Sequence, residues 1–309
     1  MENQALGLAE AVARLTPAEI TVKRVRWRTA FDRLPSSMKI PAMLDRGGDP
    51  PFPEAGGPWP DLWIATGRAT LPLSVRARRL SGGRTFIVQT QDPRWRTRDY
   101  DLVVAPEHDG LSGPNVLPIV GSPHRVSAER LAQEAEAFTE RLAGFRGPRV
   151  AALIGGRSRS FDLTAGHAAE LAARMRDAIG SAGGSLMMTF SRRTPAEAQA
   201  VLRAEMGDLP GMIWNGEGPN PYFAFLHFAD HVLVTEDSAN MAAEAASTGR
   251  PVHRLPMIPR KRDAKFERLW EKLESLGAAR GFDGDLKPWS YAPLEETERA
   301  AAHILARLS

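Results

Sequence analysis

The chain has 309 residues, of which 43% are hydrophobic and 25% charged, with no cysteine and a net charge of +3. This length and composition are typical of a soluble globular protein with two domains, and they exclude a disordered chain. The lack of cysteine excludes disulfides, a thiol nucleophile and a cysteine zinc site.

No apolar run reaches the roughly 18 residues that a membrane span needs. The acidic start of the chain does not resemble a signal or transit peptide, so we expect a cytoplasmic protein.

The first part of the chain predicts a parallel sheet. An amphipathic helix over 4–15 and an alternating strand over 19–27 precede a loop rich in Gly and Pro over 45–60. Four further strands are predicted at 61–67, 85–94, 101–109 and 115–121. Because strands that alternate with helices form parallel, doubly wound sheets, their turns should share one edge. The polar residues that we expect to converge there are Gly67, Arg68, Asp92, Arg94, Glu107, His108 and Asp109.

A second α/β pattern follows a helix over 127–143 and a linker over 144–148. We therefore predict one domain over 1–145 and another over 149–309. The strands expected in the second domain are 149–156, 185–190, 211–215, 231–235 and 251–255. The expected helices are 164–179, 195–206, 220–229, 238–247, 266–276 and 295–308.

The stretch 231–252 reads as a buried strand, a sharp turn, a helix and the next strand. Asp237 and Ser238 supply acceptors where the helix begins, and Gly249 allows it to end. The amides of such a helix point at the usual place for an anionic ligand in an open α/β sheet. Glu244, six residues after Ser238, could accept hydrogen bonds from ligand hydroxyls. The alternative is a solvated helix glutamate.

Two more strand ends combine small residues with arginine. Glycines let a phosphate approach backbone amides, and a guanidinium can fork onto it, although each turn alone also fits a purely structural role. Three such turns on one edge predict a diphosphate site. Its residues are Gly155, Gly156, Arg157, Ser191, Arg192, Asp237 and Ser238, with Glu244 beside them.

His108, flanked by Glu107 and Asp109, is the best candidate for proton transfer in the first domain. A histidine titrates near neutral pH and could take a proton from an acceptor hydroxyl, with Asp109 orienting it. The alternative is that this triplet only caps the next element. We predict no metal site, because the chain changes from helix to strand between His227 and His231 and no third ligand is near.

Motifs of several other classes are missing. No strand is followed by G-x-G-x-x-G, no tyrosine has a lysine four residues on, and neither G-x-x-x-x-G-K-[ST] nor G-x-S-x-G occurs. Six of the 40 basic residues are lysines, which leaves 34 arginines. They are spread too evenly for a nucleic-acid stripe, so we expect no nucleic-acid partner.

Eight blocks, taken in order, resemble a known family across nearly the whole chain. They are ENQALGLAE (2–10), PDLWIATGR (60–68), QTQDPR (89–94), DLVVAPEHD (101–109), NVLPIVGSPHRV (115–126), LIGGRSRSFDL (153–163), TFSRRTP (189–195) and VTEDSANMAAEA (234–245). The family is known in plants as ELM1-like mitochondrial fission proteins and has many bacterial members. The stretch 220–252 also resembles the donor-nucleotide end of a glycosyltransferase of the GT-B type.

The resemblance implies a GT-B-like fold, with two Rossmann-like domains that face a cleft and a last helix that crosses back to the first domain. It implies that Glu244 holds the nucleotide ribose and that no metal is needed, because such enzymes stabilise the departing diphosphate with amides and cations. In the family a strand and a Gly-His turn precede the first helix, so we expect this chain to start downstream of them. The alternative is that Met1 is not the true start.

We therefore expect a nucleotide-sugar-dependent glycosyltransferase that takes a nucleotide sugar as donor, needs no other cofactor, and presents its acceptor near His108 and Asp109. The alternative is a non-catalytic scaffold of the same fold, as the plant relatives suggest. Such a scaffold would recruit a protein partner and could contact a membrane peripherally.

Overall fold

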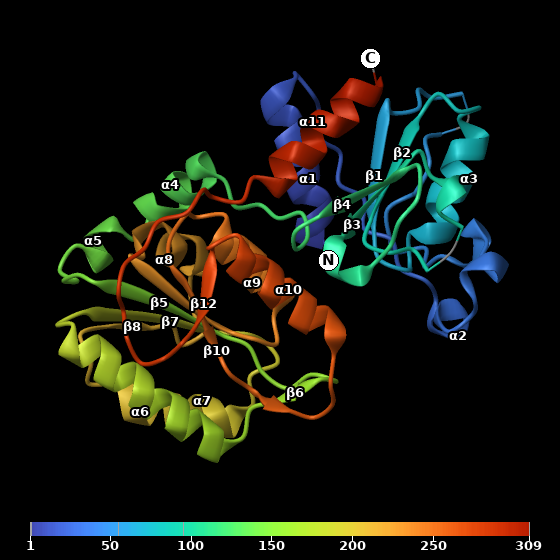
Figure 1. The fold of residues 1–309 in the computed structure, drawn as a ribbon. Helices are drawn as coiled ribbons and strands as arrows, with labels where there is room; N and C mark the ends of the chain where they lie inside the picture. The colour runs from blue at the N-terminus through green and yellow to red at the C-terminus, as the bar shows by residue number, and fades with distance from the viewer. Residues whose placement is uncertain (1, 55, 95, 309) are drawn as a thin grey trace. The chain divides into compact units, whose positions relative to one another are not determined.

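The computed structural model describes residues 2–54, 56–94 and 96–308, which form two compact units (Figure 1). Unit 1 contains the chain up to Arg125 and again from Glu295, and unit 2 contains Val126–Leu294. The chain divides ahead of the expected linker because α4 (Ala128–Glu136) packs against α8 (Tyr222–Phe228) of unit 2.

Unit 1 is built on a parallel sheet in the order β1-β2-β3-β4. The strands are β1 (Leu62–Thr66), β2 (Phe86–Thr90), β3 (Leu102–Pro106) and β4 (Val116–Ile119). Both faces of this sheet are covered, so the apolar runs of its strands are buried on each side. The even-numbered residues of β2 and β3 pack against α1 (Glu2–Leu15) and α11 (Glu296–Leu308), and the odd-numbered ones against α3 (Leu71–Leu80).

The last helix, α11, belongs to unit 1 and packs against α1. Ala300, Ala301 and Ile304 are fully buried there, together with Leu8 of α1. Because the four strands run parallel, the turns after them leave the sheet at one edge, and residues 67–68, 92–94 and 107–109 all belong to these turns.

Unit 2 contains a six-stranded parallel sheet in the order β12-β10-β9-β5-β7-β8. The strands are β5 (Arg149–Ile154), β7 (Ser185–Phe190), β8 (Gly211–Ile213), β9 (His231–Thr235), β10 (Val252–Leu255) and β12 (Ala279–Gly281). Counted along the chain and read from β8, the order is 3-2-1-4-5-6, which is the arrangement of doubly wound nucleotide-binding folds.

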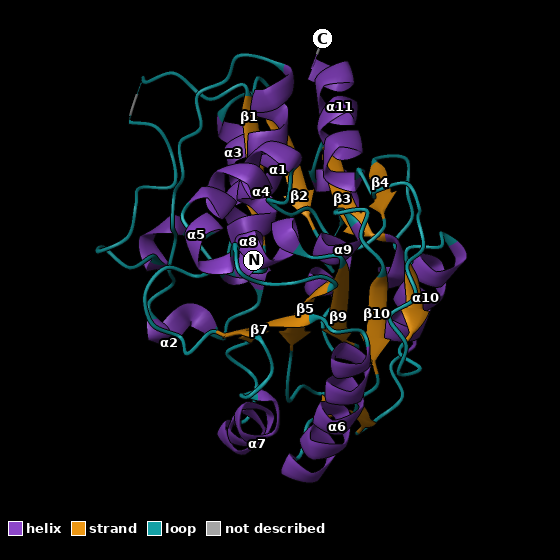
Figure 2. Cartoon of the chain, turned by 90° about the vertical axis from the view of Figure 1, so that its left-hand side faces the viewer, coloured by secondary structure: helices purple, strands orange, loops and turns teal. Residues whose placement is uncertain are grey.

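Helices cover both faces of the second sheet. On one face lie α6 (Ala165–Ser181) and α7 (Ala196–Met206), and on the other lie α8, α9 (Ala239–Ala246) and α10 (Ala264–Ser275), as Figure 2 shows together with Figure 1. The aliphatic side chains of β5 and β7 pack against α6 and α7 in one continuous core.

A short antiparallel pair lies outside this sheet and was not expected from the sequence. It joins β6 (Phe161–Asp162) to β11 (Ile258–Pro259), and the amide of Arg260 extends it by donating to the Ser160 carbonyl at 2.8 Å. The pair connects two segments that are far apart in the sequence.

The strand expected over 19–27 is wrong. Ile20 and Val22 are 38% and 43% exposed, and only Trp27, at 4%, is buried. An alternating pattern forms a strand only where a neighbouring strand can pair with it. Here isolated backbone bonds to a loop replace such a ladder, for example the 2.8 Å bond from the Asp45 amide to the Arg26 carbonyl.

The single helix expected over 127–143 is two helices, α4 and α5 (Thr139–Leu142), with the buried Phe138 between them. In the part of the chain that the structure describes, no helix is both long enough and apolar enough to cross a membrane.

Candidate functional site

The second sheet has its topological switch point between β5 and β9. These strands are neighbours, yet the helices that follow them, α6 and α9, lie on opposite faces. Ligands of doubly wound sheets bind outside the carboxyl ends of the strands at such a point. The turns at that position carry Gly155 and Gly156 after β5 and Asp237 and Ser238 after β9.

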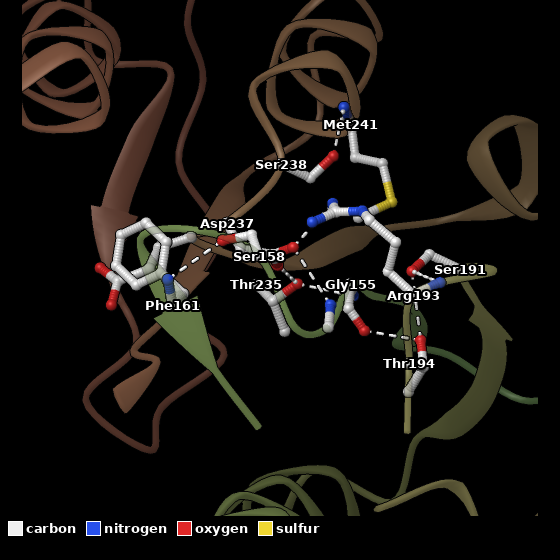
Figure 3. A network of polar contacts seen from close by, with 12 residues as sticks. Gly155, Ser158, Phe161, Ser191, Arg193, Thr194, Thr235, Asp237, Ser238 and Met241 are labelled. Carbon is white, nitrogen blue, oxygen red and sulfur yellow. Dashed lines mark hydrogen bonds and ion pairs between the residues drawn. The ribbon is translucent and has the colours of Figure 1, made fainter. Parts of the chain in front are cut away.

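Asp237 connects the turns that follow β5, β7 and β9 (Figure 3). Its side chain is 0% exposed and forms an ion pair with Arg193 at 2.7 Å. It also accepts hydrogen bonds from the Thr235 hydroxyl at 2.7 Å and the Gly156 amide at 3.1 Å. A buried carboxylate needs such partners, since an unpaired charge in the interior is costly. Asp237 therefore holds together the ends of β5, β7 and β9.

Gly155 and Gly156 are required by close packing. A Cβ atom on Gly155 would lie 2.0 Å from Asp237 Oδ1, and one on Gly156 would lie 2.1 Å from the Arg193 carbonyl oxygen. The Gly155 amide already donates to the Thr235 hydroxyl at 2.7 Å. The sequence predicted that these glycines let a phosphate approach their amides. In the structure the glycines make room for Asp237 and the Arg193 carbonyl, and both amides already donate within the protein.

Arg193 is the cation that the turn after β7 directs at Asp237, and its side chain remains 43% exposed. The next residue, Thr194, donates through its hydroxyl to the Gly155 carbonyl at 2.6 Å. Ser191 accepts from the Arg193 amide at 3.1 Å, which shapes this turn. Its neighbour Arg192, which the sequence predicted to bind the diphosphate, is exposed.

Arg157 lies beside this group, since its amide donates to the Arg193 carbonyl at 3.1 Å. Its exposed guanidinium pairs with Asp162 at 2.9 Å. Ser238 caps α9 by accepting from the Met241 amide at 3.4 Å, as its position in the sequence predicted.

Glu244 lies on α9 and accepts a hydrogen bond from the hydroxyl of Tyr222 on α8. Both residues are partly buried. Burial of the carboxyl group raises the pKa of Glu244 to about 7, although the hydrogen bond from Tyr222 opposes this shift. Burial and the nearby Glu244 carboxylate raise the pKa of Tyr222. Glu244 is thus a paired carboxyl and not a solvated one.

His108 and Asp109 belong to unit 1. They lie in a 3-10 turn, Glu107–Asp109, that follows β3 and ends at Gly110 with a φ of 73°. Both side chains are half-buried. His231 is a core residue, and its ring contacts His253. Among residues 2–54, 56–94 and 96–308, no group of three or more His, Asp or Glu has the geometry of a metal site.

A polar cluster that was not predicted from the sequence lies at the carboxyl edge of the first sheet. Gln4 is 4% exposed, and its Oε1 accepts from Gln91 at 2.7 Å and from the Thr66 hydroxyl at 3.3 Å. Gln91 has a φ of 69°, which is rare for a residue with a side chain. Neutral amide side chains give no signal of charge or titration, so only the position of Gln91 directly after β2 could have indicated the cluster.

Residues 1–308 match the family model described as "Mitochondrial fission ELM1". The chain belongs to the mitochondrial fission ELM1 family. A relative within it, "Mitochondrial fission protein ELM1" of Arabidopsis thaliana, is 30% identical over an alignment of 275 residues that covers 81% of this chain and 64% of the relative. The chain therefore spans less than two-thirds of that relative's length.

A second relative of this ELM1-family chain is "Uncharacterized protein RP120" of Rickettsia prowazekii (strain Madrid E). It is 24% identical over an alignment of 286 residues that covers 79% of each chain. Among solved structures, the UDP-GlcNAc 2-epimerase from Methanocaldococcus jannaschii is similar with a TM-score of 0.51 and 13% identity, over 80% of this chain and 77% of that one. This likeness shows the fold: the ELM1-family chain has two Rossmann-like domains of the GT-B type.

Proposed function

We propose that this ELM1-family chain binds a nucleotide sugar at the carboxyl edge of the unit 2 sheet and transfers its glycosyl group to an acceptor. The observation that carries the proposal is the switch point between β5 and β9, where Asp237 pairs with the half-exposed Arg193 directly before the N-terminus of α9, the helix that also carries the paired Glu244. The structurally similar epimerase is named for a nucleotide sugar, UDP-GlcNAc, which supports the same class of ligand here.

The diphosphate would bind between Arg193 and the first turn of α9. Asp237 fixes one edge of the Arg193 guanidinium, and the exposed remainder can donate to phosphate oxygens. The amides that open α9 add the partial positive charge of a helix N-terminus. Arg192 would contribute a second cation. Gly155, Gly156, Arg157, Ser191 and Ser238 would keep the three turns in place.

Glu244 would accept hydrogen bonds from the ribose hydroxyls. Tyr222 already orients this carboxyl group through its own hydroxyl. A carboxylate removed from water binds donors more strongly than a solvated one, because water competes less for it.

In the transfer step, the acceptor oxygen would form a bond to the anomeric carbon while the bond to the diphosphate breaks. The diphosphate leaves with the electron pair, and Arg193 and the α9 amides stabilise its charge. His108, with Asp109 beside it in the chain, would take the proton of the acceptor hydroxyl.

The test is a thermal-shift and calorimetry panel of UDP, GDP, CDP, ADP and their sugar conjugates. A ligand that binds, at a concentration about a hundred times its dissociation constant, should stabilise the wild type by roughly 2.7 kcal/mol. We expect Glu244→Ala and Arg192→Ala to lose this stabilisation. Glu205→Ala, which removes an exposed glutamate from α7, should keep it. Unchanged affinity in both site variants, or a wild type that no nucleotide stabilises, would overturn the proposal.

A further inference from the structure

Three basic stretches that are far apart in the sequence come together on one side of unit 2. All seven of their cationic side chains are exposed; they are Arg157, Arg159, Arg192, Arg193, Arg260, Lys261 and Arg262. The proposed donor site uses only some of them. The basic lobe is defined here as residues 157–162 together with 258–262.

Backbone hydrogen bonds hold these stretches side by side. The Ser160 carbonyl accepts from the amides of Arg260 and Lys261 at 2.8 and 3.4 Å, next to the β6–β11 pair. On the other side, the Arg157 amide donates to the Arg193 carbonyl at 3.1 Å. The charges are therefore gathered by the fold, against the repulsion between them, and are not scattered over flexible segments.

Much of this positive charge is not neutralised within the protein. Asp162 pairs with Arg157 at 2.9 Å, and Glu267 pairs with Arg262 at 2.9 Å. Within the described ranges, no carboxylate forms an ion pair with Arg159, Arg192, Arg260 or Lys261. All four side chains are exposed, although the Arg260 guanidinium also donates to the Ser158 carbonyl at 3.1 Å. A phosphate-bearing partner could therefore reach them.

The apolar residues of the basic lobe distinguish between classes of anionic partner. Ile258 is 37% exposed, and Pro259 beside it is also exposed. The aromatic rings of this region face each other instead, since Phe161 and Phe266 pack edge to face with centroids 5.2 Å apart. Single-stranded nucleic acid needs exposed rings on which bases stack, whereas a lipid surface accepts an aliphatic side chain among cations.

We propose that the basic lobe docks unit 2 onto a bilayer surface that carries anionic phospholipid headgroups. Arg159, Arg260 and Lys261 bind headgroup phosphates, and Ile258 enters the boundary between headgroups and acyl chains. Guanidinium groups suit this role because they bind phosphate with two parallel donors. The inference does not rest on the proposed function, since none of these four residues belongs to the donor site.

The test is flotation of the full chain with vesicles of phosphatidylcholine alone and of phosphatidylcholine mixed with phosphatidylglycerol. Each basic residue near an anionic surface contributes about 1 kcal/mol, or roughly fivefold in affinity. The variant Arg159→Gln/Arg260→Gln/Lys261→Gln should therefore bind the mixed vesicles roughly a hundredfold more weakly. Ile258→Ser should also weaken binding.

The matched control is Arg141→Gln/Arg146→Gln/Arg250→Gln. It removes the same charge from exposed positions in α5 and in the segments that lead into β5 and β10. We expect it to stay within a few-fold of the wild type, with melting temperatures and nucleotide affinity unchanged in all variants. Equal losses in both triple variants, equal binding to vesicles of phosphatidylcholine alone, or lobe-dependent binding of single-stranded RNA in place of vesicles would overturn the proposal.

Discussion

Asp237 would serve the proposed donor site without touching the ligand. Its carboxylate is buried and accepts from groups on two strand ends, including an amide 81 residues away in the sequence. Its bond to Arg193 leaves that guanidinium half exposed and fixed in direction. We regard Asp237 as a positioning residue, and Arg193 as the side chain that would meet the diphosphate.

Gly155→Ala should destabilise unit 2 by roughly 2–4 kcal/mol, because the added methyl group would overlap the Asp237 carboxylate, which cannot move without losing its partners. Denaturant unfolding measures this effect. The control is Gly180→Ala, at an exposed helical position with no atom within 4 Å of the new Cβ, which should stabilise the protein by roughly 0.5–1 kcal/mol. Similar stabilities for the two variants would contradict the role assigned to Gly155.

The raised pKa of Glu244 predicts how nucleotide-sugar affinity depends on pH. In the proposed site the ribose hydroxyls would donate to the carboxylate, so binding would favour the deprotonated form, whereas the free protein takes up a proton below about pH 7. Affinity should be constant above that pH and fall by up to about tenfold per pH unit below it. Calorimetry with a nucleotide sugar measures the effect. Glu244→Gln should bind weakly and without this dependence, and an affinity that rises on acidification would refute it.

Among the secondary-structure elements, β9 and β10 carry a buried histidine pair. His231 Nδ1 lies 3.1 Å from His253 Nε2, and both residues are 3% exposed. The rings of Phe282 and Trp289 pack against His253. Burial lowers the pKa of both histidines, to about 4 for His253, where the proximity of His231 adds to the effect.

This pair should make the stability of unit 2 depend on pH. The folded state binds protons more weakly than the unfolded chain, whose histidines titrate near their ordinary pKa of 6.5. The contribution of the pair is therefore fully present above about pH 6.5 and is lost as the pH falls toward 4. His231→Phe/His253→Phe should flatten this part of the curve of unfolding free energy against pH. His303→Phe, at an exposed position on α11, should leave it unchanged.

For the whole molecule, the division into two units predicts which segments a bound nucleotide protects from hydrogen exchange. Every residue proposed to hold the donor lies in unit 2, while His108 and Asp109 lie in unit 1. Hydrogen exchange with saturating nucleotide should therefore slow in β5, β9 and α9 and remain unchanged in β1 to β4. Protection that appears mainly in unit 1 would contradict the assignment of the donor site. Glu244→Ala under the same conditions is the control for nonspecific protection.

The fold class and most element positions could be predicted from the sequence because they depend on local patterns. The run His231–Thr235 is apolar and β-branched, as a strand buried on both faces must be, and Ser238 follows where a helix needs a cap. The prediction of a strand over 19–27 used the same kind of pattern and is wrong, because the pattern does not say whether a neighbouring strand exists.

Only the tertiary structure decided the contacts between residues that are distant in the sequence. The sequence indicated that an arginine after β7 contributes to the site. It did not show that Arg193 is the one that reaches Asp237, while Arg192 does not. It indicated Glu244 without its Tyr222 partner, and it gave no sign that β6 pairs with β11. These contacts follow from the order of strands in the sheet. That order is set by how whole elements bury their faces, which no local pattern of residues encodes.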